Sequence, residues 1–86
     1  MRSPDERTEL RDIIWENHYA LTTNAIETME ILWGDYDNIV KWVVEEQGMT
    51  EMDYLIILRE LTQFVASMPA VDRHKPAMQV YAEWSR

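Results

Sequence analysis

The chain has 86 residues, enough for one domain and too few for two, because globular domains commonly contain about 50 to 200 residues. Hydrophobic residues make up 47% of the sequence and include four Trp and four Tyr, a content that supplies a packed core and argues against intrinsic disorder. The absence of cysteine excludes disulfides, thiolate metal sites and cysteine nucleophiles. We therefore expect a single domain that spans residues 1–86.

Negative charge is abundant and unevenly distributed. Sixteen acids against eight bases give a net charge of −8, and from Asp12 to Asp53 ten carboxylates accompany one cation, Lys41. Such a surface repels phosphate groups, which argues against direct binding of nucleic acid. No apolar run approaches the ~20 residues that span a bilayer, and the N-terminus lacks the layout of a signal peptide. We expect a cytoplasmic protein that contacts neither nucleic acid nor membrane.

The first predicted element is a long helix that ends at Gly34. Ser3 suits the N-cap, Pro4 the first helical position, and Glu6 completes a capping box. Gly34 suits the left-handed position that follows a helix. The weak helix formers at 22–24 predict a bend or an interruption, so that the continuity of this helix stays open. Unbroken, it would measure about 45 Å and overhang its shorter partners, which favours pairing with another chain.

Two further helices follow. The second is short and runs from a cap at Asp35 or Asp37 to Gly48. The third begins with a capping box formed by Thr50 and Asp53 and is strongly amphipathic. Its apolar face consists of Tyr54, Ile57, Leu58, Leu61, Phe64, Val65 and Met68.

A short C-terminal helix is predicted after Pro76, where apolar residues recur at helical spacing. Pro69 ends the third helix, and the intervening linker, 70–75, holds a basic cluster. Whether the last helix packs on its own chain or swaps onto a neighbour stays open. The fold class is therefore all-α: a small bundle of three to four helices, with a long first helix, a short second, an amphipathic third and a short C-terminal helix.

An acid row without any base runs along the predicted first helix. It consists of Glu9, Asp12, Glu16, Glu27 and Glu30. Solvated helix faces usually mix both signs, because pairs of opposite charge four residues apart stabilise a helix. A row of one sign has two explanations: a solvated face that keeps the protein soluble, or a docking surface for a basic partner.

A second apolar set makes the first helix apolar over a wider arc than one neighbouring helix can cover. This aromatic flank consists of Trp15, Tyr19, Ile26 and Trp33. Large aromatic side chains are common anchors of protein interfaces, and they are also common in cores. We expect the flank to contact a partner or a second copy in a homodimer, with burial in the core as the alternative.

No catalytic or metal-binding pattern is visible. His18 and His74 lack the spacing of a helical zinc pair. The acidic stretch 35–46 differs from an EF-hand because Val40 stands where the loop needs Gly. The helix that follows Gly48 could belong to a helix-turn-helix, but it opens with carboxylates where DNA readers carry basic or amide side chains. We expect no catalytic residue, no metal and no cofactor, and therefore no enzyme.

These observations favour a small acidic protein-binding module. It would block or bridge a larger partner that is basic or binds nucleic acid, in the manner of phage or mobile-element inhibitors and DNA mimics. The alternative is a structural or assembly subunit, a helical oligomer without an inhibitory role. In that case the aromatic flank matters and the acid row is merely solvated.

Overall fold

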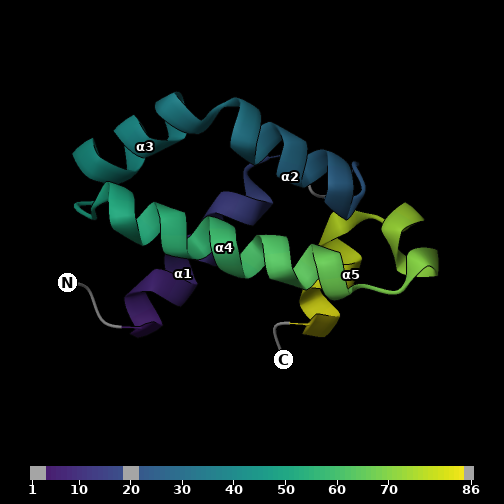
Figure 1. Ribbon diagram of the computed structural model, residues 1–86. Coiled ribbons are helices and arrows are strands. Elements are labelled where there is room, and N and C mark those ends of the chain that lie inside the picture. Colours follow the sequence, from purple (N-terminus) through teal and green to yellow (C-terminus); the bar gives the residue numbers. More distant parts are fainter. Residues whose placement is uncertain (1–3, 19–21, 85–86) are drawn as a thin grey trace.

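The computed structural model describes residues 4–18 and 22–84, which contain five α-helices, one short 3-10 helix and no strand (Figure 1). The elements are α1 (Pro4–Glu16), α2 (Ala25–Gly34), α3 (Tyr36–Glu45), α4 (Glu51–Ser67), η1 (Ala70–His74) and α5 (Ala77–Trp84). The all-α class is confirmed. The count of three to four helices is wrong, because the long first helix is divided in two.

The division falls where the weak helix formers stand. Asn24 has extended backbone angles, and its side chain accepts a hydrogen bond of 2.9 Å from the Glu27 N–H, so it caps a new helix. The carbonyl of Thr23 accepts a hydrogen bond of 2.7 Å from the Ala77 N–H at the start of α5. Backbone groups that a continuous helix would pair internally thus bind a segment distant in sequence. The overhang that favoured a second chain is therefore absent.

The two glycines predicted to end helices behave differently. Gly48 has a φ of 67° and reverses the chain between α3 and α4, as expected of a residue without a Cβ. Gly34 is instead the last residue of α2, and Asp35 alone separates α2 from α3. Ser3, the predicted first cap, lies outside the described residues, but α1 does begin at Pro4.

The central element is α4. The α2–α3 pair lies along it with the opposite chain direction, and α1 also packs against it (Figure 1). The buried face of α4 includes Tyr54, Ile57, Leu58, Leu61 and Phe64, as the apolar spacing predicts. The short helix α5 packs on its own chain, since Trp84 stacks on Phe64 with ring centroids 4.6 Å apart.

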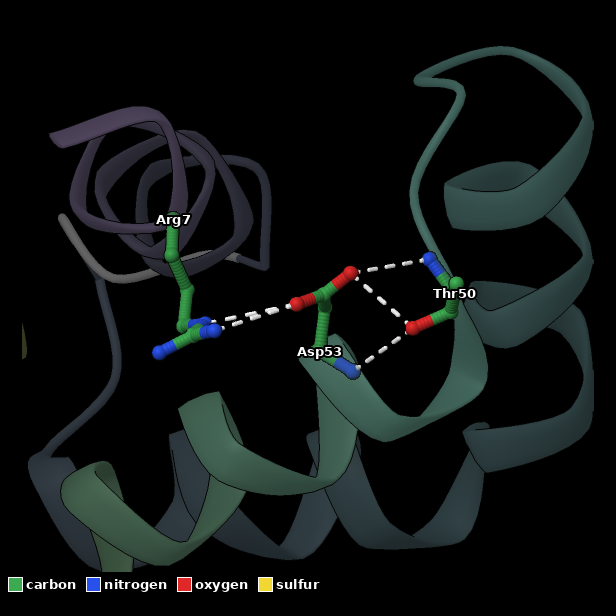
Figure 2. A network of polar contacts seen from close by, with 3 residues as sticks. All are labelled: Arg7, Thr50 and Asp53. Atoms are coloured by element: carbon green, nitrogen blue, oxygen red, sulfur yellow. Dashed lines mark hydrogen bonds and ion pairs between the residues drawn. The ribbon is translucent and has the colours of Figure 1, made fainter. Parts of the chain in front are cut away.

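A polar network fastens α1 to the start of α4 (Figure 2). Thr50 and Asp53 form the predicted capping box: the Thr50 N–H donates to Asp53 Oδ2 at 3.1 Å, and the Asp53 N–H donates to Thr50 Oγ1 at 3.2 Å. The other oxygen of Asp53, Oδ1, accepts from Arg7 Nη2 at 3.3 Å. Burial raises the pKa of Asp53, but the Thr50 hydrogen bonds and the Arg7 charge outweigh it and lower the pKa.

Because the Asp53 side chain is 2% exposed, its removal should destabilise the protein strongly. Asp53→Ala leaves the Arg7 guanidinium without its carboxylate and opens the cap of α4, which should lower the free energy of unfolding by about 3 kcal/mol in urea titrations. The matched control is Asp37→Ala, an exposed acid in the first turn of α3, where we expect a loss of ~0.5 kcal/mol. Equal losses would contradict this account.

Candidate functional site

The two arginines of α1 are turned toward the rest of the molecule. Arg7 binds Asp53, and Arg11 donates from Nη1 to Glu60 Oε2 at 2.9 Å and from Nε to the Tyr81 hydroxyl at 2.9 Å. Both side chains are little exposed, at 16% and 13%. Both arginines of α1 are therefore engaged in contacts with α4 and α5.

The outer side of α1 is left with acids. Glu9, Ile13 and Glu16 are spaced four and three residues apart and lie on one exposed stripe of the helix. Ile13 is 39% exposed. Beside it, a depression of about 210 Å³ is lined in part by Glu9, Ile13 and, from the loop before α4, Met49. We call this region the acidic α1 face; it combines carboxylates with accessible apolar surface.

The predicted acid row does not form one surface, because the helix that would carry it is divided. Glu9 and Glu16 lie on the acidic α1 face, whereas Glu27 and Glu30 are exposed on α2. Asp12 turns toward α5, where its carboxylate accepts a hydrogen bond from the Tyr81 hydroxyl and lies 4.0 Å from Arg11 Nε. Asp12 thus binds Tyr81 of α5 although its side chain is 43% exposed, which sets it apart from Glu9 and Glu16.

The predicted aromatic flank is divided as well. Trp15 is fully buried: its ring stacks on Tyr81 with centroids 5.2 Å apart, and its Nε1 donates to the Ala77 carbonyl at 3.3 Å. Its assignment to a partner surface is corrected to the core. Ile26 and Trp33 are exposed, by 39% and 49%. Tyr19, the fourth member, lies outside the described residues.

Ile26 and Trp33 border a groove between α2 and α4, which lie side by side (Figure 1). The groove has a volume of about 400 Å³, and its lining is mostly apolar. Val65 and Ala66 contribute from α4, and Glu30 is the carboxylate at its α2 edge. We call it the α2–α4 groove.

A third depression, of about 270 Å³, brings together polar groups for which the sequence predicts no common site. It is lined in part by His18, Asp35, Asn38 and Trp42. Asn38 Nδ2 donates to Asp35 Oδ1 at 2.7 Å. Burial lowers the pKa of His18, and the charge of Asp35 opposes this only partly. His18 and Asp35 stand 17 residues apart, and the depression brings together the end of the α1 segment and the junction of α2 and α3.

Over residues 4–18 and 22–84, no group of three or more His, Asp or Glu side chains converges in a way that could hold a metal ion. In the same ranges, each helix is too short or too polar to cross a lipid bilayer. Comparison of the chain with protein-family models, with curated proteins and with solved structures finds no match.

The lowered pKa of His18 predicts that stability depends on pH near neutrality. A histidine that is less basic in the folded state binds its proton preferentially in the unfolded state, so the free energy of unfolding should fall as the pH drops through about 6.5. Urea titrations between pH 7.5 and 5.5 measure the slope, which His18→Gln should reduce. A slope that His18→Gln leaves unchanged would refute the assignment.

Proposed function

We propose that the protein is a protein-binding module that captures the basic surface of a larger partner on its acidic α1 face. The observation that supports this is the partition of charge on α1. Arg7 and Arg11 bind carboxylates on the inner side, and Glu9 and Glu16 remain on the outer side next to the exposed Ile13.

Charge and apolar surface have separate roles in such a contact. Carboxylates attract a basic partner over several ångströms and raise the association rate, whereas apolar contacts at the centre of an interface slow dissociation. The acidic α1 face offers both, since Ile13 stands between Glu9 and Glu16 on one stripe. Glu6 also lines the depression and adds an exposed carboxylate to it.

In the inhibitory form of this proposal, the partner is a nucleic-acid-binding protein. Its Lys and Arg side chains are arranged to bind phosphates, and the carboxylates of the acidic α1 face would occupy them in place of nucleic acid. Such an inhibitor needs no catalytic residue and no cofactor. It acts by occupying the binding surface of its partner, so the extent of inhibition increases with the concentration of the inhibitor.

The test is capture of a partner from a lysate of the source cells on immobilised protein, with mass spectrometry of the bound fraction. We expect a protein with a basic surface that elutes at about 0.5 M NaCl, where the Debye length is roughly 4 Å. The double variant Glu9→Lys/Glu16→Lys should recover it at least about tenfold less well, because attraction at two positions becomes repulsion. Asp12 is left intact because it holds Tyr81.

The matched control is Glu27→Lys/Glu30→Lys, which changes the net charge by the same amount, from −8 to −4. It alters the acids of α2 and leaves the acidic α1 face unchanged. Circular dichroism should show equal helicity for both double variants. Equal losses of capture would mean that net charge alone attracts the partner, and an undiminished capture by Glu9→Lys/Glu16→Lys would rule out the acidic α1 face.

A further inference from the structure

The α2–α4 groove is a second surface with exposed apolar side chains. Ile26 and Trp33 are seven residues apart, two helical turns or about 10 Å, and both border the groove from α2. Val65 and Ala66 face them from α4. Apolar surface in this arrangement fits the side of another helix, whose side chains would enter between the two helices.

The indole of Trp33 is held in place although it is half exposed. Its ring lies parallel to that of Tyr36, with an interplanar angle of 8° and centroids 6.3 Å apart. The Tyr36 hydroxyl donates in turn to Glu51 Oε2 at 2.8 Å. A ring fixed in this way loses little conformational freedom when a partner covers it, which favours binding.

The exposed charges near the groove favour one kind of occupant over another. Glu27 and Glu30 are exposed on the α2 side, and Arg59 is exposed on the α4 side, one turn before Thr62, which lines the groove. These three charges sum to −1, whereas Glu9 and Glu16 of the acidic α1 face sum to −2. A basic partner is therefore attracted more strongly to the acidic α1 face than to this groove.

A second copy of the chain suits the groove better. Across a two-fold axis that sets α2 of one copy against α4 of the other, the acidic edge of each copy meets the Arg59 edge of its partner. The near-neutral edges also keep the repulsion between two acidic chains low.

We propose that the protein forms a weak homodimer in which the α2–α4 grooves of two copies face each other, with Ile26 and Trp33 at the centre of the contact. The ten residues of α2 span about 15 Å, and two helices side by side are roughly 20 Å wide. The footprint of about 300–400 Å² per copy is half of a standard interface or less, so we expect a Kd of about 10–100 µM or weaker. This proposal uses a different surface from the acidic α1 face and does not depend on it.

Sedimentation equilibrium of the full chain, from about 10 µM to about 1 mM, tests the dimer. The weight-average mass should rise above the 10.3 kDa of one chain as concentration increases. Trp33→Glu should weaken association at least about tenfold, because it places a carboxylate at the centre of an apolar contact. The matched control is Val44→Glu, which introduces the same charge at a position of α3 that is 46% exposed, and association should persist.

A charge swap tests the arrangement across the two-fold axis. Glu30→Arg and Arg59→Glu should each weaken the dimer about two- to fivefold, and the combined variant should recover most of the loss, because the complementary pair is restored with its signs exchanged. Higher salt should change the dimer of the natural chain little, because it screens both the Glu30–Arg59 attraction and the low repulsion between the two chains, whereas it should weaken capture of a basic partner.

Three results would overturn the proposal. The first is a mass that stays at 10.3 kDa throughout. The second is a dimer that Trp33→Glu leaves unaffected. The third is loss of a captured foreign protein in Trp33→Glu with no self-association, which would assign the groove to that protein. The first two leave capture by the acidic α1 face untouched, and after the third the variant Glu9→Lys/Glu16→Lys still shows whether that face takes part, so the failure of this proposal and that of the acidic α1 face can be told apart.

Discussion

The attachment of α1 to α4 through two arginines is the constraint on which the rest of the structure depends. Arg7 and Arg11 are four residues apart and therefore lie on one side of the helix, and each binds a carboxylate of α4 at 3.3 Å or less. The Arg11 guanidinium also lies over the ring of Trp84, 4.6 Å from the ring centroid, and so connects α5 to α1. These contacts fix the rotation of α1 about its axis, which in turn decides that Ile14 and Trp15 enter the core and Glu9 faces outward.

The local features of this fold were predictable, and the contacts between distant segments were not. The capping box of Thr50 and Asp53 follows from two residue types three positions apart, so the sequence suffices to find it. The third member of that network, Arg7, comes from 46 residues away, and no spacing rule links it to Asp53. The division after Glu16 is an intermediate case. Weak helix formers at 22–24 indicated a bend or a break, and the pairing of Thr23 with Ala77 is the tertiary contact that accompanies the break.

The candidate surfaces show the same limit. Trp15 and Trp33 are 18 residues, five full turns, apart, so a continuous helix would place them on one flank. The break between α1 and α2 removes this relation, and each helix then rotates to bury its own apolar side. Trp15 becomes fully buried and Trp33 stays half exposed. Residue type identified both as large apolar groups in need of cover, but only the helix orientation decides which one the chain covers itself.

The uneven charge of the surface is partly a product of packing. Arg7 and Arg11 are little exposed and each bind a carboxylate of α4, which removes positive charge from contact with a partner while most acids remain outside. A domain of this size also covers only ~60% of the surface of its unfolded chain, so some apolar side chains stay exposed. The half-exposed Trp33 lies in the near-neutral groove, whereas Ile13 lies among acids. By charge alone, apolar surface among acids suits a basic protein better than a second acidic chain, whereas apolar surface between edges of opposite sign suits a second copy. The positions of a few cations thus distinguish the two exposed apolar regions on which the two proposals rest.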